Sequence, residues 1–214
     1  MKEKELREII VEIGNQLLER RLTSGTGGNV SGRLEGQDWF LITPSGIPYP
    51  EITPEDLVRL DLNGKQVGGT YKPSIEKNMH LKIFQQRDDI NIIIHTHSLY
   101  AQAVACTRKA IPPILDAVAI MFGGPIAVAE YARPGSPELA ENVAAKLVKE
   151  NGCLIANHGA IAAGKDYAEA MEYCELIESA AQVFLFSQII GNPVALTPEE
   201  IKANLDFFNS QYGQ

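Results

Sequence analysis

The stretch "NIIIHTHS", residues 91–98, combines three consecutive isoleucines with two histidines. A short apolar run of β-branched residues is typical of a strand that is buried on both faces of a sheet. Successive side chains of a strand point to opposite faces, so His95 and His97 are expected on the same side, where this strand ends. The stretch therefore predicts a central strand with a pair of imidazoles at its end.

A third histidine, His158, follows a second apolar segment, "CLIAN" at 153–157, and precedes Gly159. Strand ends are where α/β proteins commonly place their chemistry. Three neutral imidazoles that leave one coordination position open form a typical catalytic zinc site. A single histidine is more often a core or surface residue, however, and His158 can join the pair only if the fold brings the two strands together. From these residues alone, both interpretations stay open.

The remainder of the chain alternates helical and strand patterns in mixed order. Polar residues at 35–38 and the Asn63-Gly64 pair predict the turns of two hairpins. The apolar pieces from 114 to 131 fit neither pattern clearly. We predict an α/β fold with a single domain over 1–214, a three-layer α/β/α arrangement around a mainly antiparallel sheet. Apolar periodicity and capping residues predict helices over 4–21, 75–86 and 166–190, and helices that begin at Ser98, Ser136 and Thr197.

Composition narrows the class of protein. The 214 residues carry a formal net charge of −8, which argues against a nucleic-acid partner but allows a local pocket for a small anion. No segment approaches the roughly 20 apolar residues of a membrane span, so no membrane partner is expected. Cys106, Cys153 and Cys174 are widely spaced, without a CxxC pair. They are expected to be small buried hydrophobes in a reducing cytoplasm rather than a disulfide framework.

The glycine-rich stretch "GTGGNVSGR", residues 25–33, does not have the spacing of a dinucleotide loop. Val30 stands where the third glycine of G-x-G-x-x-G belongs, and the stretch follows a predicted helix instead of a strand. The backbone N–H groups of such a run can still form a nest for a phosphate. Thr26, Asn29 and Ser31 could add side-chain donors. A plain turn is the alternative.

Two further small-residue segments follow, "TPSG" at 43–46 and "KPS" at 72–74, and the second precedes a predicted helix whose free N–H groups suit an anion. Three such loops in one domain favour a divided phosphate site. Glu76 and His80 are four residues apart and share a face of that helix. Glu76 could simply suit the helix dipole, and His80 could pack beneath the site or support one of its residues.

Taken in order, "GTGGNVSGR", "TPSG", "KPS-x-E-x3-H", "HTHS" and "NHG" resemble the class II aldolase/adducin family over nearly the whole chain. The pattern is closest to those members that cleave L-fuculose 1-phosphate. The resemblance implies an α/β/α fold around a nine-stranded, mainly antiparallel sheet. It also implies a homotetramer with active sites at subunit interfaces.

The resemblance implies a role for each motif. His95, His97 and His158 are the expected zinc ligands, with Mn²⁺ or Co²⁺ as alternatives. Glu76 is the expected acid/base and, in some resting states of the family, a further metal ligand. The implied reaction cleaves a ketose 1-phosphate, such as L-fuculose 1-phosphate, to dihydroxyacetone phosphate and an aldehyde through a zinc-stabilised enediolate. The substrate phosphate is expected at Gly28, Asn29, Ser45, Gly46, Ser74 and Ile75.

The sequence departs from this family at two places. Aldolases of this type usually carry Ser-Ser-Glu where this chain has Ser74-Ile75-Glu76, so Ile75 offers a backbone N–H but no hydroxyl. A tyrosine expected after "IPP" is missing, and Asp116 lies at or beside that place. Asp116, or Tyr212 in a C-terminal tail that closes over the site, is the candidate second proton donor.

Three other functions fit the same family. L-ribulose 5-phosphate 4-epimerases usually have an aspartate at the acid/base position, so Glu76 favours an aldolase, whereas Asp116 keeps an epimerase open. A decarboxylase of a phosphorylated keto acid would use the same enediolate chemistry. Adducin-like interaction domains lose the metal site, and the presence of all three histidines with the glutamate argues against that class.

Overall fold

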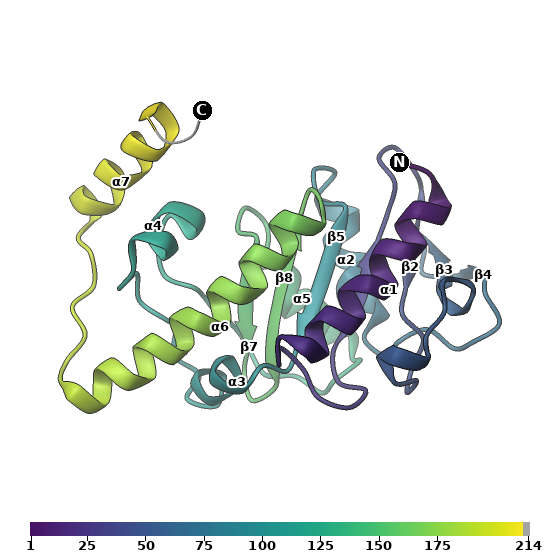
Figure 1. The fold of residues 1–214 in the computed structure, drawn as a ribbon, viewed down its shortest axis with the longest axis horizontal. Coiled ribbons are helices and arrows are strands. Elements are labelled where there is room, and N and C mark those ends of the chain that lie inside the picture. Colours follow the sequence, from purple (N-terminus) through teal and green to yellow (C-terminus); the bar gives the residue numbers. More distant parts are fainter. Residues whose placement is uncertain (212–214) are drawn as a thin grey trace.

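The computed structural model describes residues 1–211, and its core is one sheet in the order β4-β3-β2-β1-β5-β8-β7-β6 (Figure 1). All neighbouring strands are antiparallel except β6 and β7. The described part of the chain has eight strands instead of the nine that the resemblance implied; Pro44 and Pro73 form only an isolated bridge. The strands are β1 Asn29–Gly32, β2 Trp39–Ile42, β3 Val58–Asp61, β4 Gln66–Gly68, β5 Ile92–Thr96, β6 Val128–Ala129, β7 Gly152–Ile155 and β8 Gly159–Gly164.

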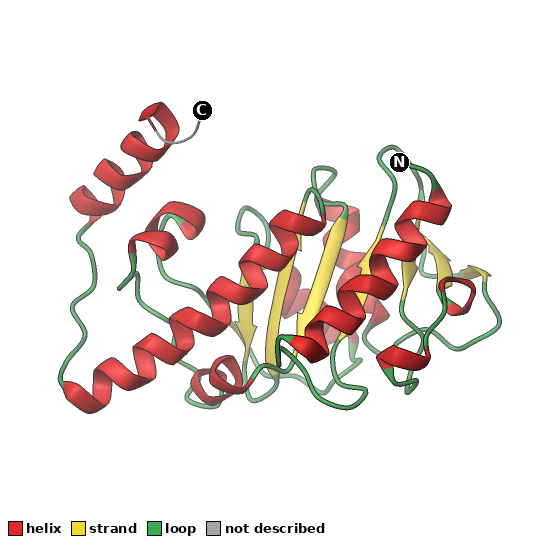
Figure 2. Cartoon of the chain, in the orientation of Figure 1, coloured by secondary structure: helices red, strands yellow, loops and turns green. Residues whose placement is uncertain are grey.

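Helices cover both faces of the sheet, which confirms the three-layer prediction (Figure 2). The helices α1, α3 and α6 pack on one face, and α2 and α5 pack on the other. The helix α7 contacts α4 beyond the β6 end of the sheet. Within the described residues, no helix has both the length and the apolar character needed to cross a membrane. The helices are α1 Glu3–Glu19, α2 Lys77–Gln86, α3 Leu99–Ala105, α4 Asp116–Phe122, α5 Pro137–Ala144, α6 Tyr167–Ile190 and α7 Pro198–Gln211, with 3-10 turns at Tyr49–Glu51 and Pro54–Asp56.

The alternation of side chains along β5 decides where its histidines point. Ile92 and Ile94 pack into the core beneath α1, α3 and α6, whereas Ile93 packs into the core beneath α2 and α5. His95 continues the alternation of Ile93 and therefore faces the α2 layer. On that side, Glu76 at the N-cap of α2 lies beside His95.

Several local predictions are confirmed. Both hairpins form, and Gly64 adopts a φ of 81° in the second turn. The side chain of Ser136 caps α5 by accepting from the N–H of Leu139, and Asp166 caps α6 in the same way. One predicted boundary was wrong, because α2 begins at Lys77 instead of residue 75.

The cysteine prediction holds for two of the three residues. Cys153 and Cys174 are buried, but Cys106 is exposed. Cys106 is the C-cap of α3, so it lies at the helix end instead of on the face that packs against the sheet. The three thiols are free in the structure.

Candidate active site

The chain enters α2 through a turn that leaves the Glu76 side chain free. The hydroxyl of Ser74 accepts the N–H of Glu76 at 3.3 Å, and the carbonyl of Ser74 accepts the N–H of Lys77 at 3.2 Å. Glu76 is the N-cap of α2, yet its side chain makes no capping hydrogen bond. Its carboxylate instead lies beside the histidines at the end of β5.

Strand pairing brings the three histidines together. His95 lies in β5 opposite Ile161 of β8, and His158 lies in the turn between β7 and β8. The Nε2 atoms of His95 and His97 are 3.0 Å apart. The Oε2 atom of Glu76 lies 3.2 Å from Nε2 of His95, and its Oε1 atom lies 3.3 Å from Nε2 of His158. The four potential ligand atoms all lie within 4.8 Å of one another.

This cluster fits a divalent metal ion. The Nδ1 atom of His95 lies 2.8 Å from the carbonyl of Ala160; donation there leaves the Nε2 lone pair directed into the cluster. The Oε1 atom of Glu76 is buried and has no hydrogen-bond partner among the described residues. A buried carboxylate oxygen without a donor is costly unless a cation balances it. Three imidazoles and a carboxylate are ligands that zinc and similar divalent ions accept.

The electrostatics of the metal-free cluster favour, for three of the four residues, the protonation state that a metal ligand needs. Burial alone would raise the pKa of Glu76, but His95, His158 and the Asn29 hydrogen bond outweigh it and hold that pKa below its usual value. Burial and the neighbouring His95 lower the pKa of His97 and of His158 to about 4. The carboxylate is therefore ionised at neutral pH, and these two imidazoles are neutral.

A cavity of about 430 Å³ opens above the cluster. All six residues expected to bind phosphate line it, together with Glu76, His97 and His158, whereas His95 is fully buried beneath it. The walls also contain Thr26, Gly27 and Pro44, which belong to the predicted phosphate loops, and Pro134, which was not among the predicted site residues. Pro134 could not be found from the sequence because residues 131–136 carry no recognisable motif. The lining is Thr26, Gly27, Gly28, Asn29, Pro44, Ser45, Gly46, Ser74, Ile75, Glu76, His97, Pro134 and His158.

The glycine-rich loop lies directly against the histidines. Gly28 has a φ of 72°, and a Cβ atom there would lie 2.4 Å from the carbonyl oxygen of His95. Only glycine combines this backbone conformation with so close an approach. The carbonyl of Gly27 accepts hydrogen bonds from the hydroxyls of Thr23 at 2.8 Å and Tyr49 at 3.3 Å. These two bonds hold the loop at the cavity wall.

Two expected side-chain donors have other partners. Ser31 is fully buried, and its hydroxyl lies 2.6 Å from Nδ1 of His80, so it does not face the cavity. The side chain of Asn29 donates to Oε2 of Glu76 at 2.9 Å and contacts Nε2 of His80 with its carbonyl oxygen. Asn29 therefore orients the carboxylate, a role that the sequence did not predict.

Of the two candidate proton donors, the structure describes only Asp116, and it lies away from this cavity. Asp116 is exposed and accepts a hydrogen bond from Asn204 of α7 at 2.8 Å, and it is not among the described residues that line the cavity. Its position at the start of α4 places it beyond the β6 end of the sheet. Tyr212 lies outside the described residues.

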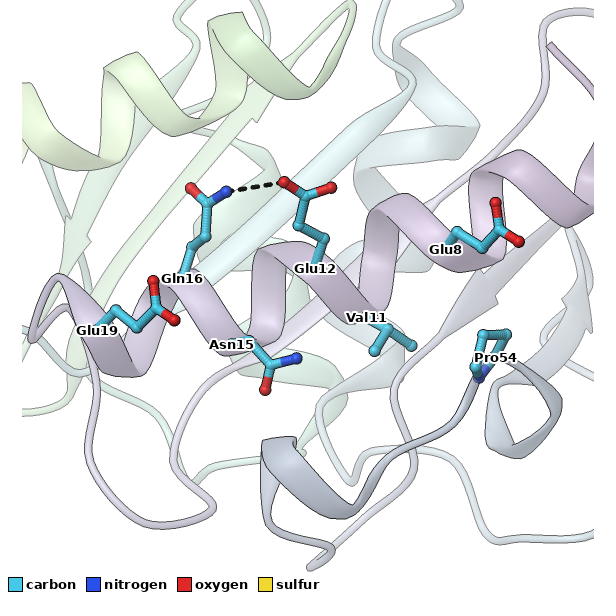
Figure 3. A pocket seen from close by; sticks show the side chains of 7 residues that line it. All are labelled: Glu8, Val11, Glu12, Asn15, Gln16, Glu19 and Pro54. Carbon is cyan, nitrogen blue, oxygen red and sulfur yellow. Dashed lines mark hydrogen bonds between the residues drawn. The ribbon is translucent and has the colours of Figure 1, made fainter.

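A second hollow follows the outer face of α1, opposite Pro54 (Figure 3). Its walls include Glu8, Glu12 and Glu19, and Gln16 donates to Glu12 within it. Carboxylates repel a phosphate, and none of the predicted site residues is among its lining. The cavity beside the histidines is therefore the candidate active site.

Known proteins resemble this chain over nearly its whole length. A 5-deoxy-D-ribulose 1-phosphate aldolase from Bacillus thuringiensis is 38% identical over 209 residues, which are 97% of each chain. An L-fuculose phosphate aldolase from Escherichia coli is 36% identical over 214 residues, 100% of this chain and 98% of the relative. A solved structure of an L-fuculose 1-phosphate aldolase has a TM-score of 0.91 and 38% identity, and the match covers 96% of both chains. The family model "Class II Aldolase and Adducin N-terminal domain" matches residues 8–185, and the chain belongs to the class II aldolase and adducin family.

Proposed function

We propose that this chain is a divalent-metal-dependent aldolase that cleaves a ketose 1-phosphate to dihydroxyacetone phosphate and an aldehyde. One observation carries the proposal. A carboxylate and three imidazole nitrogens converge within 4.8 Å at the base of a cavity whose other walls are small-residue loops. Such a cavity offers a charged reaction centre and, beside it, backbone N–H groups for an anionic substrate.

His95, His97, His158 and Glu76 would hold the metal, which we propose is zinc; manganese or cobalt also suits these donors. A divalent ion bound there supplies Lewis-acid stabilisation of the negative charge that develops on the enediolate oxygens. The lining contributed by Gly28, Asn29, Ser45, Gly46, Ser74 and Ile75 would hold the phosphate.

Glu76 is the proposed acid/base. Its carboxylate is ionised, is largely buried and is oriented by Asn29. In the condensation direction it would accept the proton from the hydroxymethyl carbon of dihydroxyacetone phosphate, and the C–H electron pair would pass to the carbonyl. In the cleavage direction it would accept the proton of the substrate hydroxyl, whose O–H electron pair forms the aldehyde carbonyl as the C–C bond breaks, and would then deliver that proton to the same carbon.

The proposed substrates follow from the two relatives. L-Fuculose 1-phosphate and 5-deoxy-D-ribulose 1-phosphate share the part that becomes dihydroxyacetone phosphate and differ in the aldehyde. The names of the relatives support both compounds equally.

We also propose a homotetramer with active sites at subunit interfaces, in a reducing cytoplasm. Exposed apolar residues on the second half of α6, among them Val183, Phe186 and Ile189, support burial against another copy. The three free thiols support the proposal of a reducing cytoplasm.

The test uses metal-loaded protein with L-fuculose 1-phosphate, 5-deoxy-D-ribulose 1-phosphate and ribulose 5-phosphate in parallel. We expect release of dihydroxyacetone phosphate from a ketose 1-phosphate, and we expect EDTA to stop it. Conversion of ribulose 5-phosphate to xylulose 5-phosphate without such release would indicate an epimerase instead. Turnover of none of the three would contradict the proposal.

A further inference from the structure

Four buried polar side chains form a continuous row that runs from the core to the wall of the cavity. The hydroxyl of Ser31 lies 2.6 Å from Nδ1 of His80, and Nε2 of His80 lies 2.5 Å from Oδ1 of Asn29. The Nδ2 atom of Asn29 then lies 2.9 Å from Oε2 of Glu76. Ser31 and His80 are fully buried, and Asn29 and Glu76 are nearly so. Water therefore has little access to any of these atoms.

The chemistry of each group fixes the direction of the whole row. An ionised carboxylate can only accept, so Asn29 must turn its NH₂ group toward Glu76. Its carbonyl oxygen then faces His80, whose Nε2 must carry the proton. A neutral imidazole has one proton, so Nδ1 of His80 accepts from the hydroxyl of Ser31. If the amide were reversed, two acceptors would meet at Glu76.

We infer that His80 is a positioning residue, which holds the Asn29 amide in the one orientation that donates to Glu76. His80 touches neither the cavity nor the proposed metal ligands in these contacts. Its effect passes through Asn29 to the orientation of the carboxylate. The effect of His80 on catalysis rests on the proposed function, because it requires Glu76 to transfer a proton. The position of the proton on His80 does not depend on that function.

The first test is therefore spectroscopic and needs no substrate. Protein labelled with ¹⁵N-histidine distinguishes the two neutral tautomers of an imidazole by NMR, and a His80→Gln sample assigns the signal. We expect the Nε2–H tautomer of His80 between about pH 6 and 8, with and without added zinc. The Nδ1–H tautomer or a protonated ring would overturn the inference, whatever the enzyme does.

The second test compares variants of one helix. His80→Leu removes the donor, His80→Gln places an amide N–H in a similar position, and Met79→Leu changes a neighbouring buried residue at similar volume. The readouts are kcat and KM for ketose 1-phosphate cleavage, exchange of a hydroxymethyl proton of dihydroxyacetone phosphate with deuterium, bound zinc, and Tm.

We expect His80→Leu to lower kcat and proton exchange together by about 10- to 100-fold, with KM and bound zinc nearly unchanged. His80→Gln should recover most of the loss, and Met79→Leu should resemble the parent protein. Equal losses in Met79→Leu, no rescue by glutamine, or loss of zinc in His80→Leu would overturn the inference. An inactive parent protein would instead contradict the proposed function, and the tautomer measurement would still decide the role of His80.

Discussion

The Oε1 atom of Glu76 lies 3.3 Å from Nε2 of His158, while the other oxygen of the same carboxylate lies 3.2 Å from Nε2 of His95. One side chain at the start of α2 thus contacts histidines from β5 and from the β7–β8 turn. The proposed acid/base and the proposed metal ligands are therefore a single electrostatic unit. A change in the charge of Glu76 must alter the protonation of the histidines as well.

Replacing Glu76 with glutamine separates proton transfer from metal binding. We expect Glu76→Gln to lower cleavage by at least about 100-fold, because an amide cannot accept the proton. Bound zinc should stay within about twofold of the parent value, because three imidazoles remain as ligands. Release of dihydroxyacetone phosphate and metal content by mass spectrometry measure the two effects. The exposed Glu51→Gln serves as the control. Near-normal cleavage by Glu76→Gln would exclude the assigned role.

Metal affinity should fall as the pH is lowered, and one histidine should become protonated before the others. Burial alone would lower the pKa of His95, but Glu76 outweighs it and raises that pKa above the ordinary 6.5. His97 and His158, with pKa values of about 4, stay neutral until the solution is far more acidic. A proton on His95 must leave before a metal binds, so affinity is full above the pKa of His95 and is lost below it.

We expect zinc affinity, measured by competition with a chelator, to fall about tenfold per pH unit below the pKa of His95 and more steeply below about pH 4. Glu76→Gln removes the charge that raises this pKa, so the fall should then begin at lower pH. A constant affinity between about pH 6.5 and 5 would contradict the assignment.

The sequence predicts those elements of the fold whose own residues show a strand, helix or turn pattern. The isoleucines of 92–94 identify β5, and Asn63-Gly64 identifies a hairpin. In contrast, β8 has the sequence "GAIAAG", whose small residues have low strand propensity and show no alternation. These small residues allow α6 to pack closely, since a Cβ atom at Gly164 would lie 2.5 Å from the backbone nitrogen of Ala170. Only the assembled structure reveals this requirement.

The candidate site, like the fold, could be predicted only where neighbouring residues in the sequence form it. The spacing of His95 and His97 places both on one face of a strand, but it could not bring in His158. That step depends on the pairing of β5 with β8, the strand that the sequence did not reveal. The contact between Asn29 and His80 joins residues 51 positions apart, and no local pattern encodes it. The roles of these residues in catalysis stay predictions.

Ile75 is the residue at which this chain departs from the usual Ser-Ser-Glu pattern, and it is 65% exposed at the cavity. We expect Ile75→Ser to lower KM for a ketose 1-phosphate by about 2- to 10-fold, because a hydroxyl adds one hydrogen bond to the phosphate. The kcat should change little. Ile75→Ala removes the same apolar bulk without adding a donor, so its KM should match the parent value. An equal improvement in both variants would indicate relief of crowding instead of a new hydrogen bond.

Arg33 holds the end of α2 in place from a nearly buried position, 4% exposed. Its guanidinium donates to the carbonyls of Phe84 at 3.0 Å and Ile90 at 2.9 Å, and also to that of Arg87. We expect Arg33→Met to lower the free energy of unfolding by about 3 kcal/mol, since it leaves buried carbonyls without donors. Urea denaturation measures the loss, with the exposed Arg133→Met as the control. A loss no larger than that of the control would contradict this role.

Gly14 in α1 makes room for the residue that holds the glycine-rich loop. A Cβ atom at this position would lie 2.3 Å from Cδ1 of Tyr49, whose hydroxyl donates to Gly27. Alanine normally stabilises a helix interior by about 1 kcal/mol relative to glycine, whereas overpacking a core costs about 1–3 kcal/mol. We therefore expect Gly14→Ala to destabilise the protein and to raise KM more than it lowers kcat, because the Tyr49 ring and the loop must shift together.

A double-mutant cycle tests whether the Tyr49 ring is the cause. The stability loss from Gly14→Ala should shrink when Tyr49 is replaced by alanine, which lacks the Cδ1 and Cε1 atoms that the new methyl group would meet. Asn15→Ala, on a partly exposed position of the same helix, should not destabilise the protein. If Gly14→Ala gave the ordinary stabilisation of an alanine in a helix, the Tyr49 ring would have space to move, and the loop would be held by Thr23 instead.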